Sequence, residues 1–71
     1  MDSNSIIVNG KIDEIFPGGR VTVILENNVT IPATFSGKMK RMHSKTLRGD
    51  NVVVSISPYD MTRGVIIEIK K

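Results

Sequence analysis

Short runs in which apolar and polar residues alternate are the feature that most constrains how this chain of 71 residues can fold. Successive side chains of a β-strand point to opposite faces, so each such run predicts a strand with one buried face. Residues 20–26, 29–36, 51–57 and 65–71 follow this pattern and are rich in β-branched side chains. The expected inward sets are Val21, Val23 and Leu25; Val29, Ile31, Ala33 and Phe35; Val52, Val54 and Ile56; and Val65, Ile67 and Ile69.

The first apolar segment, residues 6–16, has a less regular pattern. It keeps one phase as far as Ile12 and then slips by one residue near Asp13–Glu14. Such a slip predicts a β-bulge, and Gly10 within the strand predicts a sharp bend. We expect Phe16, at the end of the segment, to point inward. A long first strand that bends suits a small barrel, which must close on itself.

Turn residues separate these segments and leave one long gap. Pro17–Gly19, Glu26–Asn28 and Pro58–Gly64 predict hairpins, because glycine and asparagine tolerate the positive φ that tight turns require. Pro32 predicts an edge position or an unpaired backbone nitrogen in the third strand. Residues 36–50, between the third and fourth strands, form the one connection long enough to hold a helix.

This order predicts an all-β protein: a five-stranded OB-fold antiparallel barrel with one short helix or loop between strands 3 and 4. An SH3-like barrel is the main alternative, with shorter connections at that point. We expect a single OB-fold domain over residues 1–71, with residues 1–5 as a flexible N-terminus. The chain has no cysteine, so neither a disulfide nor a cysteine-based zinc site supplements so small a core.

The net charge of +3 and the sequence pI near 9.6 indicate a polyanionic partner. The N-terminus carries an acid, Asp2, and no basic segment before a long apolar run, which argues against a secretory signal. No apolar stretch reaches the roughly 20 residues needed to cross a bilayer. We therefore expect a protein of the cytoplasm, or of an organelle stroma, without membrane contact.

The sequence indicates neither a catalytic site nor a metal site. His43 is the only histidine, and it has no cysteine, second histidine or carboxylate at ligand spacing, so we expect no metal or other cofactor. No nucleophile elbow or glycine-rich phosphate loop is present. A barrel of this size also offers little concave volume, so a small hydrolase has almost no support.

Half of the chain's ten lysines and arginines lie in residues 36–50, with no acid before Asp50. Cations near a helix start oppose the macrodipole by roughly 0.3–1 kcal/mol each, so a helix built only for stability would carry acids there. The same arrangement beside unpaired backbone N–H groups suits an anion. The segment predicts binding to the phosphates of RNA or DNA, with a passive, solvated surface as the alternative. The cations are Lys38, Lys40, Arg41, Lys45 and Arg48.

We expect a short α-helix in this segment, with Ser36 as its N-cap and Gly49 as a stop beyond its end. Arg48–Asp50 is expected to form the turn into the fourth strand. On a helical wheel, one side carries most of the cations and the opposite side packs against the barrel. The wheel groups Lys38, Arg41 and Lys45 against Met39, Met42 and Thr46, with His43 beside the methionines, and the expected anchors are Met39, Met42 and Leu47.

The few aromatic residues indicate the kind of nucleic acid. Proteins that bind single strands stack bases on exposed rings, yet this chain contains only Phe16, Phe35 and Tyr59. Because both phenylalanines are expected to point inward, Tyr59 is the one expected platform. A structured RNA recognised by shape and phosphates is therefore favoured. A general single-stranded nucleic-acid chaperone of the cold-shock type is the alternative.

Several short motifs occur in the order and spacing of a known family. From Val8 to Lys71 the chain resembles bacterial-type translation initiation factor one, an S1-like family with an OB-fold. It departs from the family's usual pattern at residues 42–47, which lack an aromatic and two isoleucines, and at Val65, where an arginine is usual. The motifs are PGG followed by Arg20-Val21, LEN at Leu25–Asn27, SGKMKR at Ser36–Arg41, and SPYDMTRG at Ser57–Gly64.

The resemblance implies a non-enzymatic, monomeric factor that binds in the A site of the small ribosomal subunit during initiation. It would contact the decoding-site helix of the ribosomal RNA and an adjacent ribosomal protein, block premature tRNA entry, and support initiation factors two and three. By resemblance the RNA-binding residues are Lys38, Lys40, Arg41, Lys45 and Arg63. Arg48, His43 and Tyr59 complete the candidate set.

Overall fold

The computed structural model describes residues 5–70, with the side chains of residues 42–44 excepted. Within this range the chain forms five strands and one 3₁₀ helix, η1. The flexible N-terminus expected from the sequence falls largely on residues 1–4, which lie outside the described residues. The elements are β1 Ile6–Phe16, β2 Arg20–Leu25, β3 Thr30–Phe35, η1 Gly37–Lys45, β4 Asn51–Ser57 and β5 Asp60–Lys70.

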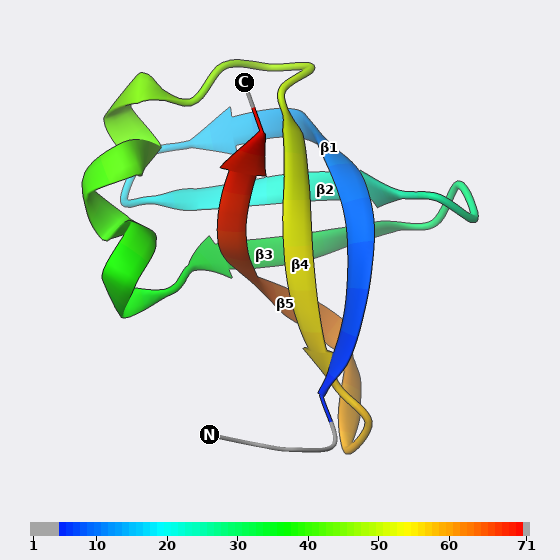
Figure 1. The fold of residues 1–71 in the computed structure, drawn as a ribbon. Coiled ribbons are helices and arrows are strands. Elements are labelled where there is room, and N and C mark those ends of the chain that lie inside the picture. Colours follow the sequence, from blue (N-terminus) through cyan, green and yellow to red (C-terminus); the bar gives the residue numbers. More distant parts are fainter. Residues whose placement is uncertain (1–4, 71) are drawn as a thin grey trace.

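Figure 1 shows the strands closed into a barrel, with η1 along one side between β3 and β4. The strand order is β1-β2-β3-β5-β4, and β4 returns to pair with β1. Four of the strand pairs in the described residues are antiparallel. The closing pair is parallel and joins Ala33–Phe35 of β3 to Gly64–Ile66 of β5. This architecture confirms the predicted OB-fold class.

The core fills the inside of this barrel with side chains from all five strands. The inward sets predicted for β2 and β4 lie here, with Leu25 half-buried against the core. Val29 was expected to point inward, but it precedes β3 and is 47% exposed. The buried apolar residues are Ile12, Val21, Val23, Ile31, Ala33, Phe35, Val52, Val54, Ile56 and Ile66.

The phase predicted for the last strand is wrong over most of its length. Ile66 is fully buried, whereas Val65 and Ile67 are exposed. The β4–β5 register shifts between Val53 and Val54, so β5 accommodates an extra residue at this point. Residues before the bulge therefore face opposite to the phase read backward from the end of the strand.

The predicted bulge in β1 is confirmed. The register between β1 and β2 shifts between Ile12 and Glu14. At the shift the Thr22 hydroxyl accepts a hydrogen bond from the Glu14 N–H (3.1 Å) and donates one to the Asp13 carboxylate (3.4 Å). A side chain of β2 thus bonds the backbone where the regular ladder is interrupted.

Beyond this bulge, Phe16 points outward and is 44% exposed, so its predicted inward position is wrong. Phe16 pairs with Arg20, and residues directly opposite one another on neighbouring strands share a face. Arg20 lies on the outer face because Val21, the next residue, belongs to the core.

The predicted hairpin turns form, with one of them shorter than expected. Gly18 and Gly19 have φ values of 84° and 79°, and Asn28 has a φ of 66°, which supplies the left-handed backbone that these turns require. The β4–β5 turn consists only of Pro58 and Tyr59, because β5 begins at Asp60.

The segment η1 is a 3₁₀ helix where the sequence led us to expect an α-helix. It has about three residues per turn, so Lys38 and Arg41 still share a side, but Lys45 does not continue it. The Ser36 carbonyl accepts the Met39 N–H at 2.9 Å, which places Ser36 just before the helix as expected. Met39 packs against the core and Thr46 is 4% exposed, whereas Leu47 is 64% exposed and is not the expected anchor.

Candidate nucleic-acid interface

The exposed cations of η1 form the first part of the candidate interface. Lys38, Lys40 and Arg41 are exposed, and the first turn of η1 contains no acidic residue. Lys45 is exposed at the end of the helix. Positive charge at the start of a helix opposes its dipole. This part of the surface is therefore electrostatically suited to an anion and costs the folded protein some stability.

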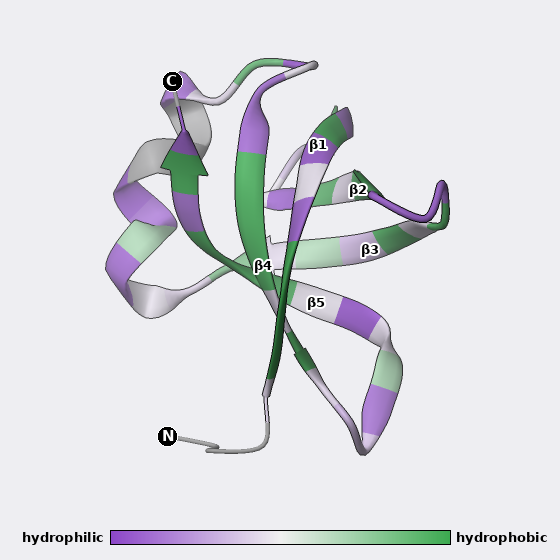
Figure 2. Cartoon of the chain, turned by 45° about the vertical axis from the view of Figure 1, so that its right-hand side comes forward, coloured by the Kyte–Doolittle hydropathy of each residue, from purple (hydrophilic) through white to green (hydrophobic). Residues whose placement is uncertain are grey.

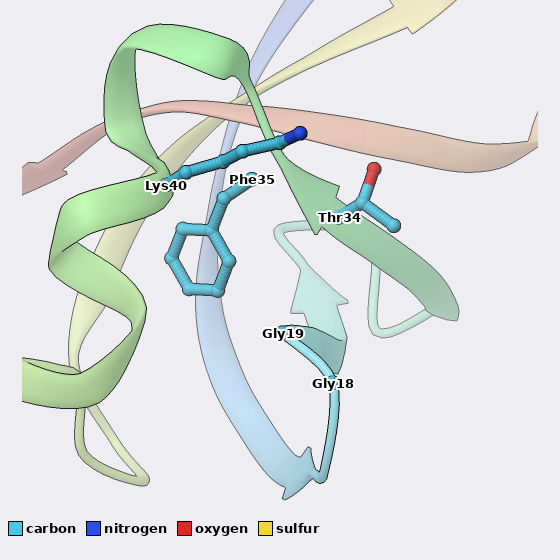
Figure 3. Close-up of a pocket in the computed structure, with 5 residues that line it drawn as sticks. All are labelled: Gly18, Gly19, Thr34, Phe35 and Lys40. Atoms are coloured by element: carbon cyan, nitrogen blue, oxygen red, sulfur yellow. The ribbon is translucent and has the colours of Figure 1, made fainter.

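A depression of about 590 Å³ lies between η1, the β1–β2 turn and the end of β3. Figure 3 shows the Lys40 side chain extending from η1 toward Thr34, with the Phe35 ring between η1 and the turn. Gly18 and Gly19 line the other side. A ligand's backbone can approach these glycines closely because they carry no side chain. Lys40 therefore stands over a hollow that can receive a phosphate or a base.

Arg63 lies on the β4–β5 hairpin and is held there by Asp60. The Arg63 Nε donates to Asp60 Oδ2 at 3.1 Å, and the pair is exposed. Asp60 also accepts the Thr62 N–H (3.2 Å) and the Thr62 hydroxyl (2.5 Å). These bonds from Thr62, with a smaller contribution from Arg63, lower the pKa of the Asp60 carboxyl below its ordinary value. Asp60 thus orders the hairpin tip and orients the guanidinium.

We expect acid to loosen this hairpin only below the ordinary pKa of an aspartate. Because the pKa of Asp60 is lowered in the folded state, its contribution to stability is present above the unfolded-state pKa and is lost as the pH falls through the folded-state pKa. The amide ¹⁵N shifts of Thr62 and Arg63, followed between pH 2 and pH 7, measure this. Asp60→Asn should remove the titration, and a midpoint at or above the ordinary aspartate value would contradict the expectation.

Arg48 has a different environment from the other candidate cations. Its Nε donates to the carbonyl oxygen of Asp13 at 3.1 Å. In the same place the Gly49 N–H donates to the Ile12 carbonyl (2.8 Å), and the Ile12 N–H donates to the Asp50 carbonyl (2.9 Å). The predicted turn at Arg48–Asp50 is confirmed, and it is fastened to the bulge of β1. Arg48 is thus tied to the barrel through Nε.

The remaining two candidates are Tyr59 and His43. Tyr59 is 83% exposed at the tip of the β4–β5 turn, as the sequence led us to expect. The Ser57 hydroxyl fixes this turn by accepting the Tyr59 N–H at 3.2 Å. His43 belongs to η1, but its side chain lies outside the described residues.

Sequence reasoning missed Arg20 and Phe16 as surface residues of the same region. Together they line a depression of about 490 Å³ with Pro17 and Pro32. Arg20 also lines a second cleft that contains Arg63. The signal was present in the alternation of residues 20–25, which places Arg20 opposite Val21. Pairing across the Pro17–Gly19 turn then carries Phe16 to the same outer face.

Among residues 5–70, apart from the side chains of 42–44, no three histidine, cysteine or acidic residues are grouped so that they could hold a metal ion. In the same part of the chain, no helix has the length and apolar character needed to span a membrane.

Residues 2–71 match the protein family described as Translation initiation factor 1A / IF-1. The translation initiation factor IF-1 of Malacoplasma penetrans is 48% identical over 62 residues, which cover 87% of this chain and 86% of that protein. The translation initiation factor IF-1 of Mycoplasma genitalium is 44% identical over 70 residues, which cover 99% of this chain and 100% of that protein.

The fold leads to the same relatives. The solution structure of translation initiation factor IF-1 from the Wolbachia endosymbiont of Brugia malayi superposes with a TM-score of 0.75 at 33% identity, over 97% of this chain and 82% of that chain. Similarity in sequence thus extends over nearly the whole length, and it coincides with the closed five-stranded barrel. This chain belongs to the translation initiation factor 1A / IF-1 family.

Proposed function

We propose that this protein occupies the A-site decoding region of the small ribosomal subunit during initiation. Its family membership supports the role, and the observation that carries it is the group of exposed cations Lys38, Lys40 and Arg41 at the start of η1, without a compensating acid in the first turn. Phosphate contacts of this kind supply affinity and position a protein on RNA. The expected contacts are the decoding-site helix of the ribosomal RNA and a ribosomal protein beside it.

The mechanism is occupancy. The bound factor blocks premature tRNA entry and supports initiation factors two and three, so no chemical step and no enzymatic activity are required. We propose a cytoplasmic monomer that acts as a single OB-fold domain without a cofactor. The proposed RNA-binding residues are Lys38, Lys40, Arg41, Lys45, Arg48, Arg63, His43 and Tyr59.

Sedimentation of the purified protein with small ribosomal subunits tests this function. We expect it to sediment with small subunits, more strongly when initiation factors two and three are present, and not with large subunits. Equal sedimentation with both subunits would indicate non-specific attraction to RNA, and no sedimentation with small subunits would refute the proposal.

Binding to the small subunit is expected to weaken steeply as the salt concentration rises. If about four cations meet phosphates, the slope of log affinity against log salt should be on the order of −3, taking the single-strand coefficient. Equilibrium binding of a labelled protein measured over a series of potassium chloride concentrations gives this slope. An affinity independent of salt would contradict the electrostatic account.

The exposure of Phe16 favours a second candidate function, a general chaperone of single-stranded nucleic acid. Phe16 and Tyr59 are both exposed, so the surface offers one ring more than the sequence predicted for stacking bases. Competition separates the two functions. An initiation factor prefers intact small subunits over unstructured oligonucleotides, whereas a chaperone of this type binds both with similar affinity.

A further inference from the structure

Strands β3 and β5 separate on one side of the short segment in which they pair, and a cleft lies at that point. Their parallel pairing is confined to Ala33–Phe35 and Gly64–Ile66. The first half of β5 runs away from β3 toward the β4–β5 turn (Figure 1). The cleft has a volume of about 570 Å³, within the roughly 300–1,000 Å³ typical of ligand sites. It lies apart from the depression under Lys40, although Thr34 lines both.

Cations from two different strands line this cleft. Arg20 comes from the start of β2 and Arg63 from β5. Asp60 engages the Nε of Arg63, and the terminal nitrogens of a guanidinium carry further donors in a fork that matches a phosphate. Figure 2 shows the first part of β5 coloured largely as hydrophilic, next to the more apolar end of β3. The charge of the cleft is therefore complementary to an anion.

The wall between these cations is apolar and flat. Pro32, Ala33 and Val65 line it, and Val65 is 39% exposed. An apolar surface of this kind offers van der Waals contact to the face of a base. Thr34 and Ser57 also line the cleft, and their hydroxyl groups can donate to or accept from the edge of a base. An apolar wall, two guanidinium groups and two hydroxyls together suit a nucleotide.

An extended peptide fits the cleft less well. A peptide that adds a strand to an open sheet edge needs a row of unpaired backbone donors and acceptors. Pro32 has no N–H and lies in the part of β3 that pairs with β2 alone. The open edge of β3 is thus interrupted where a peptide would have to pair with it.

We infer that this cleft binds one unpaired nucleotide of an RNA, with the base against Pro32 and Val65 and a phosphate between Arg20 and Arg63. The inference rests on the proposed binding to RNA and adds a defined site, formed by residues outside η1. A nucleotide that has left its stack exposes both the face and the edge that such a site reads. The site therefore distinguishes looped-out nucleotides from a regular helix, which the cations of η1 do not.

Chemical-shift titration of the ¹⁵N-labelled full chain tests this site. The probes are uridine 5′-monophosphate, adenosine 5′-monophosphate, inorganic phosphate and an acidic tetrapeptide. We expect the nucleotides to shift the amides of Ala33, Thr34, Gly64 and Val65, and phosphate alone to bind about tenfold more weakly because it lacks the base. Arg20→Gln and Arg63→Gln should each weaken nucleotide binding about tenfold, since each removes one charged partner of the phosphate.

Lys38→Gln is the matched control, because it removes one exposed cation of η1 that does not line the cleft. It should leave the nucleotide shifts at the cleft unchanged. Arg20→Gln keeps the test decisive if Arg63→Gln loosens the β4–β5 hairpin. Equal affinity for phosphate and nucleotide, preference for the peptide, or unchanged binding in both arginine variants would each overturn the site. Sedimentation with small subunits is measured separately, so a failed titration with intact subunit binding refutes the cleft and leaves the proposed function standing.

Discussion

Replacing Lys40 and Arg41 together with glutamate is expected to abolish binding to the small ribosomal subunit while leaving the melting temperature unchanged or slightly higher. Both side chains are exposed near the start of η1. Reversing their charge places repulsion where phosphates are expected to bind. The same change favours folding, because acids near a helix start suit the dipole better than cations do, by roughly 0.3–1 kcal/mol each. Sedimentation with small subunits and a thermal melt of the same sample measure the two effects.

A double reversal elsewhere controls for the change in net charge. Lys11 and Lys70 are exposed, and both pair with Asn51 in one row across β1, β4 and β5. Lys11→Glu with Lys70→Glu should weaken subunit binding only through long-range attraction, and most of the affinity should survive at moderate salt. A large fall in the melting temperature of the η1 variant would show that its cations serve the fold. Full retention of subunit binding would return the basic segment to a solvated surface.

The largest expected loss of stability comes from adding one methyl group, in Gly64→Ala. Gly64 is buried where β5 meets β3, and a Cβ there would collide with Val54 Cγ1 and lie 3.3 Å from Ile31 Cδ1. Val54 is fully buried and branched at Cβ, so its side chain has little room to move. Overpacking of this kind costs about 1–3 kcal/mol. In a domain of this size, that lowers the melting temperature by roughly 10 °C.

Gly37→Ala is the control for the backbone effect of the same substitution. No atom lies within 4 Å of a Cβ built at Gly37, and its φ is not in the left-handed region. The added methyl group reduces the freedom of the unfolded chain, so this variant should be neutral or more stable by up to about 1 kcal/mol. Equal melting temperatures for the two variants would show that the barrel opens at Gly64 and tolerates the side chain. Thermal melts followed by circular dichroism make the comparison.

The sequence by itself determined the strands, the fold class and the position of the charge. Alternation in residues 20–26 and 51–57 identified the buried faces of β2 and β4, because half-buried strands must alternate. The slip near Asp13–Glu14 identified the bulge of β1. Clustering of cations in residues 36–50 identified the exposed surface of η1, since charges without buried partners stay in water. Each of these features depends on residues close together in the chain.

The tertiary structure alone decided which residues share the candidate surface. The phase of β5 could not be read from its sequence, because Val65, Ile66 and Ile67 are all apolar and the bulge opposite β4 selects the one that enters the core. Phe16 is apolar, yet pairing with Arg20 turns it outward. Burial and register are set by strands far apart in the chain. They therefore became visible only when the barrel closed and brought Arg20 and Arg63 to the same cleft.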